Sequence, residues 1–174
     1  YVSNKKTGGG REIVPFELTW ITLILGFPKR IVGFYKNAIQ IKGAEEIDET
    51  YNLLMDYGDS IFNLSVDVVS RCATRRLVIN GSKKQLYWNW DDDMIRIFDP
   101  DLDRWNNIKY EIPHAQSGYN KNISEKMYID EMACFLKAVR NEGSFPNDLE
   151  HDHRVLKTLY SGERSDKNNR IELL

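Results

Sequence analysis

Between residues 31 and 112 the chain is a series of short apolar segments separated by turn residues, and this pattern constrains the fold more than any other feature. Residues 60–69 show it most clearly, because Phe62, Leu64 and Val66 alternate with polar side chains. A period of two predicts strands with one buried face and one face that is wet or covered by a partner. We expect strands at residues 31–35, 51–57, 60–69, 75–79, 85–90, 94–98 and 108–112, with hairpin turns at 58–59 and 80–82.

A helix is expected before this region, at residues 15–25. Pro15 suits a first helical turn, and Gly26 followed by Pro28 is typical of a helix end. The segment is apolar almost all round, which predicts a helix sandwiched between other elements.

Two helices and a final strand are expected after the strands. Ser124 caps a predicted helix that ends at Gly143, and Asp148 caps the next one. We expect the second of these helices to point four side chains inward, Leu149, Leu156, Leu159 and Tyr160, and a strand to follow at residues 170–173. This order predicts an α+β fold, an open, largely antiparallel β-sheet with helices packed on one face.

Length, charge and cysteine content exclude several classes of protein. The 174 residues carry 24 basic and 26 acidic side chains, a formal net charge of −2, and a chain of this length forms its own core. No apolar run is long enough to cross a bilayer, and no leader segment opens the chain. Cys72 and Cys134 are isolated, which indicates a reducing compartment. We therefore predict a soluble, cytoplasmic protein with no membrane partner, and the first residue, Tyr1, suggests that the chain starts inside a longer gene product.

Four groups of residues have both a functional and a structural interpretation. Gly8-Gly9-Gly10 could cradle a phosphate, but no strand precedes it and no Lys-Ser or Lys-Thr follows, so residues 1–10 are interpreted as a linker or hinge. His151 and His153 point to different sides of a helix, and neither aspartate run has both the glycine and the distal glutamate of a calcium loop. No metal site is predicted. The aromatic residues of the strands could stack sugars or bases, but acidic turns cancel the nearby positive charge, so no nucleic-acid partner is predicted.

Three segments, in their order along the chain, resemble the C-terminal half of the Gfo/Idh/MocA oxidoreductases. The first is the triglycine followed by a helix that ends in Leu25-Gly26-Phe27-Pro28. The second is the strand and turn at residues 76–81, and the third runs from Phe135-Leu136-Lys137-Ala138-Val139 through Pro146 and Val155-Leu156 to Ile171-Glu172-Leu173. The resemblance covers nearly the whole chain from Gly8, and it implies residues 11–174 to be a substrate-binding and oligomerisation domain.

The resemblance implies an NAD(P)-dependent oxidoreductase that acts on a sugar, a polyol or a related hydroxyl compound. In that family NAD or NADP is bound by an N-terminal Rossmann domain, and neither its nucleotide fingerprint nor its Glu-Lys-Pro segment occurs here. This chain alone is therefore not expected to be active or to bind the cofactor. The chain's partners would be its own Rossmann domain, a small-molecule substrate and further copies of itself, through the outer face of the sheet.

The resemblance also indicates where the substrate would bind. The His-x-x-Asp that is frequent in the family falls on Phe16 and Thr19, neither of which can shuttle a proton. The nearest polar side chains are Arg11, Glu12 and Glu17, so Glu12 or Glu17 is predicted to act as the base or to orient a water. Glu17 could instead merely stabilise the helix start.

Two alternatives remain open in the sequence. His114, in a loop after Pro113, could face a ligand, although nothing identifies its partner. The chain as a whole could instead be a non-enzymatic module that binds carbohydrate or protein through the aromatic side chains of its sheet.

Overall fold

The computed structural model describes residues 2–111, 125–146 and 148–174, and the chain divides into two compact units. The first unit contains the residues up to Ser70 together with those from Asn147 to the end, and the second contains Arg71–Pro146. The first unit is built from α1 (Gly10–Leu25), β1 (Arg30–Lys36), β2 (Thr50–Asp56), β3 (Ile61–Asp67), α3 (Leu149–Asn168) and β8 (Glu172–Leu173).

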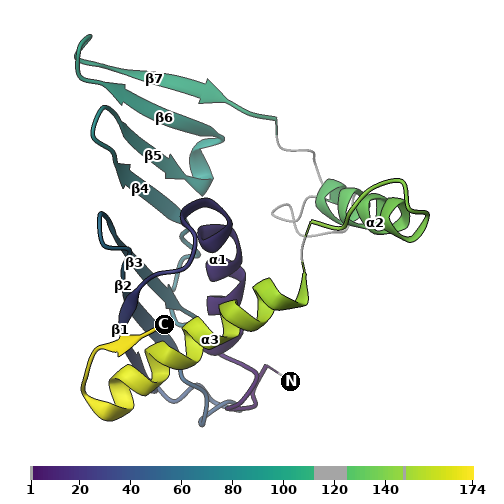
Figure 1. Ribbon diagram of the computed structural model, residues 1–174. Helices are drawn as coiled ribbons and strands as arrows, with labels where there is room; N and C mark the ends of the chain where they lie inside the picture. Colours follow the sequence, from purple (N-terminus) through teal and green to yellow (C-terminus); the bar gives the residue numbers. More distant parts are fainter. Residues whose placement is uncertain (1, 112–124, 147) are drawn as a thin grey trace. The chain divides into compact units, whose positions relative to one another are not determined.

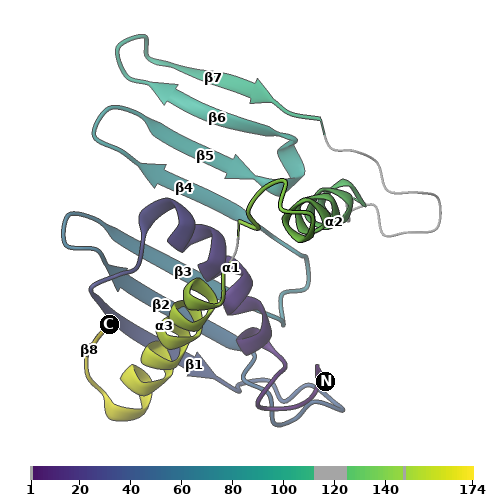
Figure 2. The same ribbon diagram turned by 45° about the vertical axis from the view of Figure 1, so that its right-hand side comes forward.

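The first unit is an antiparallel sheet with strand order β3-β2-β1-β8, and α1 and α3 cover one face of it (Figures 1 and 2). The alternation of apolar side chains along β2 and β3 places one set of them under the helices, where they are removed from water. The core of this unit consists of Val14, Leu18, Ile21, Ile31, Tyr51, Leu53, Met55, Tyr57, Leu64, Val66, Val155 and Leu159.

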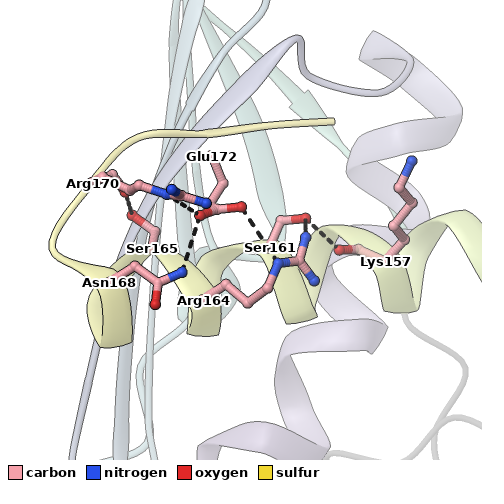
Figure 3. A network of polar contacts seen from close by, with 7 residues as sticks. All are labelled: Lys157, Ser161, Arg164, Ser165, Asn168, Arg170 and Glu172. Atoms are coloured by element: carbon pink, nitrogen blue, oxygen red, sulfur yellow. Dashed lines mark hydrogen bonds and ion pairs between the residues drawn. The ribbon is translucent and has the colours of Figure 1, made fainter.

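A network of polar contacts holds the C-terminal strand beside the end of α3 (Figure 3). The Glu172 carboxylate accepts a hydrogen bond from Arg170 at 2.8 Å and longer ones from Arg164 and Asn168, each at 3.4 Å. The Ser165 hydroxyl donates to the Arg170 carbonyl at 2.6 Å. The bond from Arg170 is the main reason that the pKa of Glu172 lies below its ordinary value. These contacts explain how a strand of two residues stays paired with β1.

The second unit contains a separate antiparallel sheet with strand order β4-β5-β6-β7, and the helix α2 (Glu125–Val139). Its strands are β4 (Arg76–Asn80), β5 (Gln85–Asn89), β6 (Met94–Asp99) and β7 (Arg104–Lys109), with a short 3₁₀ turn η1 (Trp90–Asp92) before β6. Cross-strand partners share a face of a sheet, so the register divides the side chains into two sets. One set, the apolar face, consists of Leu77, Ile79, Leu86, Trp88, Ile95, Ile97, Asn106 and Ile108, with the charged pair Asp99 and Arg104 at its end.

The expected α+β class, with open antiparallel sheets, is confirmed, but the strands form two sheets rather than one. The end of β3 gives a physical reason. The Asp67 carboxylate accepts hydrogen bonds from the backbone amides of Val69 (3.0 Å) and Ser70 (2.7 Å), and this Asx turn bends the chain away from the strand direction. The strand expected at residues 108–112 corresponds to β7, which begins earlier, at Arg104.

The first helix differs from its prediction in two ways. It begins at Gly10 instead of Pro15, because contacts with distant residues stabilise the additional turn: the Gly10 amide donates to the Asp48 carbonyl at 2.9 Å. It is also not sandwiched, since Phe16 is 66% exposed and Ile24 is 69% exposed in this structure. Only the side that carries Val14, Leu18 and Ile21 is buried.

The last helix starts as predicted, with the Asp148 carboxylate accepting a hydrogen bond from the His151 amide at 2.7 Å. Its buried side was predicted wrongly, because Leu149, Leu156 and Tyr160 are exposed and only Leu159 of the four is buried. Small residues form the rest of the contact, because α3 packs closely on β1 at Gly162. No helix in the described ranges combines the length and the hydrophobicity that a membrane crossing requires.

Candidate functional site

A hollow of about 370 Å³ lies beside the first turns of α1, between this helix and α3. Both helices belong to the first unit, so its geometry is that of a single packed body. The lining residues are Lys6, Thr7, Arg11, Glu12, Pro15, Phe16, Thr19, Leu156, Leu159 and Tyr160. Four of the side chains that the sequence suggested for substrate contact or catalysis therefore come together here.

Arg11 is held in place at the edge of this hollow by three groups. Its Nε and Nη2 atoms donate to the two carboxylate oxygens of Glu163, at 2.6 and 3.1 Å. Its Nη1 atom donates to the Lys6 carbonyl at 2.6 Å, and the guanidinium lies 5.3 Å from the centre of the Tyr160 ring. The bond with Glu163 is the main reason that the pKa of Arg11 is raised. Arg11 therefore joins the first turn of α1 to α3, in addition to lining the hollow.

Glu163 is the centre of this network, and the sequence interpretation did not find it. It also accepts a hydrogen bond from the Tyr51 hydroxyl at 3.1 Å, and Tyr51 stacks on Tyr35 with 5.4 Å between the ring centres. Burial, aided by the Glu163 carboxylate, raises the pKa of Tyr51 and keeps its hydroxyl protonated. Glu163 lies 152 residues after Arg11, so no local pattern connects the two residues. The one available signal was its position in α3, next to the small residues that face the sheet.

The structure separates the two glutamates that were predicted as alternative bases. Glu12 lies in the first turn of α1 and lines the hollow. Glu17 does not line it, and its carboxylate accepts a hydrogen bond from the Trp20 indole at 2.7 Å. Because the helix begins at Gly10, Glu17 lies in its middle, and the expected role of Glu17 in stabilising a helix start is wrong.

The remaining predicted site residues have different positions. Phe16 and Thr19 line the hollow, and the Thr19 hydroxyl donates to the Pro15 carbonyl at 2.8 Å. That bond satisfies a carbonyl of α1, so Thr19 contributes mainly shape to the hollow. His114 lies outside the described residues.

The triglycine segment is packed against the chain itself. A Cβ atom at Gly9 would lie 2.6 Å from the Asp48 carbonyl oxygen, and one at Gly10 would lie 2.8 Å from the Tyr51 ring. Gly8, Gly9 and Gly10 are all buried, so the C-terminal end of the segment interpreted as a linker is packed against the first unit. A dinucleotide pyrophosphate does not fit this segment, because the neighbouring backbone occupies the space that it would need.

The described residues contain no group of three or more His, Cys, Asp or Glu side chains placed to hold a metal ion. His151 instead contacts the Thr22 hydroxyl at 3.0 Å and the Phe27 ring, with 5.2 Å between ring centres. The polar side chains that line the hollow are one carboxylate, two cations, two threonine hydroxyls and one phenol, beside an apolar wall.

No family model and no curated protein matches this sequence. Solved structures do match its fold. The putative oxidoreductase YvaA of Bacillus subtilis aligns over 98% of this chain and 54% of its own, with 12% identity and a TM-score of 0.75. A putative NADPH-dependent oxidoreductase of Desulfitobacterium hafniense aligns over 91% of this chain and 46% of its own, with 14% identity and a TM-score of 0.70.

A third similar structure is the UDP-N-acetylglucosamine 3-dehydrogenase GnnA of Acidithiobacillus ferrooxidans. It aligns over 89% of this chain and 46% of its own, with 15% identity and a TM-score of 0.67. This chain thus spans about half the length of the proteins whose fold it shares. At these identities the likeness establishes the fold alone.

Proposed function

We propose that this chain is the substrate-binding half of an NAD(P)-dependent oxidoreductase of the Gfo/Idh/MocA type, acting on a sugar, a polyol or a related hydroxyl compound. The observation that carries the proposal is the alignment of nearly the whole chain with about half of several oxidoreductases, of which one acts on a UDP-sugar. The hollow beside α1 supports it, because four of the suggested residues, Arg11, Glu12, Phe16 and Thr19, line one cavity.

In this proposal the hollow holds the hydroxyl compound. Glu12 provides a carboxylate that can accept a hydroxyl proton, while Lys6 and Tyr160 can donate hydrogen bonds to further oxygens of the substrate. Phe16 and Leu156 provide an apolar wall for the carbon skeleton. Arg11 is already bound to Glu163, so we assign it the role of keeping the first turn of α1, and with it Glu12, in position.

The nicotinamide nucleotide, when bound, accepts the hydride from the carbinol carbon. We assign its binding to a Rossmann domain outside these 174 residues, because the described residues contain no strand that leads through spaced glycines into a helix. An open reading frame that lacks an upstream strand, G-x-G-x-x-G and helix would contradict the proposal. It would favour the non-enzymatic binding module instead.

The test compares two matched glutamate variants of the full-length protein, with sugars and polyols as substrates and the reduced nicotinamide as the readout. Glu12→Gln should reduce the turnover rate by a factor of about 10²–10⁴, the usual contribution of a general base, with little change in melting. Glu17→Gln should leave turnover nearly unchanged and cost about 0.5–1.5 kcal/mol of stability, because it weakens the hydrogen bond with Trp20. Equal turnover in both variants and the wild type would show that the base lies elsewhere.

We also propose that copies of the chain associate through the apolar face of the second sheet. Seven of its ten side chains are aliphatic or aromatic, the charged pair Asp99 and Arg104 lies at its end, and Ile79 and Ile108 are 43% and 51% exposed. The Trp88 indole donates to the Tyr110 hydroxyl at 2.7 Å, so covering this ring leaves no indole donor unpaired. Sedimentation should show a dimer or larger species at micromolar concentration, and Ile97→Lys should shift it toward the monomer. A wild-type monomer at high micromolar concentration would remove this part of the proposal.

A further inference from the structure

The second face of the β4–β7 sheet is positively charged and rich in amides. Its twelve side chains form three rows of four, each row running across the strands from β4 to β7. The rows are Arg76, Asn89, Met94 and Lys109; Val78, Tyr87, Arg96 and Asn107; and Asn80, Gln85, Phe98 and Trp105. We call these twelve residues the basic face, because they include three cations and no carboxylate.

Arg96 lies in the middle row and is held between two aromatic rings. Its guanidinium carbon lies 5.8 Å from the centre of the Tyr87 ring and 5.0 Å from the centre of the Trp105 ring. Phe98 packs on Trp105 from the next row, with 5.3 Å between the ring centres. Contact with two rings restrains the guanidinium at the surface of the sheet, and the planar fork of an arginine suits a carboxylate or a phosphate.

No ion pair among the described residues uses the cations of this face. The carboxylates near it in sequence lie at the ends of the strands: at residues 91–93 between β5 and β6, at residues 99–103 from the end of β6 to β7, and at Glu111, two residues after Lys109. One of them, Asp99, is already bound to Lys84 at 2.8 Å. Arg96 therefore forms no ion pair with another side chain in the described part of the chain.

The acidic turns limit the size of an anion that this face can bind. They lie at the two ends of β6, so an extended polyanion that ran along the strand would meet negative charge at both ends. The face itself spans about 14 Å across its four strands and about 14 Å along them. A compact anion fits these limits, whereas a nucleic-acid strand does not.

We propose that the basic face binds a small anionic sugar, a hydroxyl-rich ring that carries one carboxylate or one phosphate. Arg96 pairs with the anionic group through its N–H edge. The amide of Asn107, opposite Arg96, can donate to and accept from the hydroxyls of the ring. Trp105, 38% exposed, offers apolar surface to the C–H groups of the sugar. This site belongs to the second unit and does not depend on the hollow beside α1.

The experiment titrates the protein with four probes and follows backbone and indole N–H signals by NMR. The probes are glucuronate, glucose 6-phosphate, glucose and inorganic phosphate. We expect one or both anionic sugars to bind with a dissociation constant of about 1 mM or lower and to shift the signals of β5, β6 and β7. The glucuronate and glucose 6-phosphate arms distinguish a carboxylate ligand from a phosphate ligand. Glucose and phosphate should each bind at least about 10-fold more weakly than the better anionic sugar.

Three variants test the role of Arg96. Arg96→Gln should weaken binding by about 10-fold or more. Arg96→Lys should weaken it less, because lysine keeps the charge, but it should still weaken it, because lysine lacks the planar fork. Lys83→Gln is the control, since it removes one exposed charge from the turn after β4 and should change binding by less than about 2-fold.

Several results would overturn the proposal. These are the absence of binding by either anionic sugar, equal binding of glucose, an equal loss in the Lys83 variant, or shifts that map away from the basic face. Tighter binding of a short oligonucleotide than of either sugar would show that the size limit is wrong. The mapping uses the wild type, so it decides the question even if an Arg96 variant does not fold.

Discussion

Replacing Glu163 tests whether the ion pair with Arg11 holds the first turn of α1 in place. The two side chains are 22% and 19% exposed, and two hydrogen bonds join them. Glu163→Gln preserves the shape of the side chain and one acceptor oxygen. It removes the negative charge, leaves a partly buried guanidinium without its counter-ion, and weakens the contact with the Tyr51 hydroxyl.

The expected loss lies between two known limits. Exposed ion pairs contribute about 0–1 kcal/mol, and breaking a fully buried pair costs about 3–5 kcal/mol. For a pair that is about one-fifth exposed and retains one hydrogen bond, we expect a loss of about 1–2 kcal/mol in the free energy of unfolding. In a chain of this length that corresponds to a decrease of about 2–8 °C in Tm.

The measurement is urea and thermal unfolding of the wild type, Glu163→Gln, Arg11→Gln and the double variant. The cycle should give a coupling energy of about 1–2 kcal/mol. Asp130→Asn is the control, because the Lys126–Asp130 pair is 60% and 59% exposed and should contribute less than about 0.5 kcal/mol. If Glu163→Gln costs no more than Asp130→Asn, the pair does not anchor the helix and the role assigned to Arg11 is wrong.

Two further perturbations address the core of the first unit. Glu49 is 1% exposed, and a hydrogen bond from the Ile39 amide is the main reason that its pKa is lowered. The ionised carboxylate therefore stabilises the fold above the ordinary carboxyl pKa of about 4.3. This contribution is lost as the pH falls through the lower pKa of the folded state. Wild-type and Glu49→Gln urea curves should consequently converge at acid pH, and a constant difference would contradict this. Gly33→Ala should cost about 2 kcal/mol or more, since its Cβ would lie 2.5 Å from the Gly162 carbonyl oxygen. Gly162→Ala meets only the flexible end of Leu53, at 2.6 Å, and should cost less in the same assay.

Local sequence patterns predicted the elements whose structure is decided by residues close to them in the sequence. The β2–β3 hairpin follows from a period of two around a turn at residues 58–59, and its strands lie where that pattern predicts them. The start of α3 follows from the Asp148 cap, and the end of α1 from Gly26, whose φ of 75° suits a residue without a side chain. The class of fold follows from the order of such elements.

Contacts between distant residues decided what the local patterns could not. The start of α1 moved to Gly10 because Asp48 and Glu163, far along the chain, hold its first turn. The buried side of α3 is lined by small residues, because close packing on β1 at Gly33 excludes the larger side chains that hydrophobicity alone would place there.

The candidate site was likewise predicted in part from local sequence and decided in part by contacts between distant residues. Residue type and resemblance selected Arg11, Glu12, Phe16 and Thr19, and these do share one hollow. The sequence alone could not choose between Glu12 and Glu17, because that choice depends on where the helix begins and on which direction each carboxylate then faces. The choice became possible only when α3 supplied Glu163 and the opposite wall, since a cavity is a property of packed elements and not of any one segment.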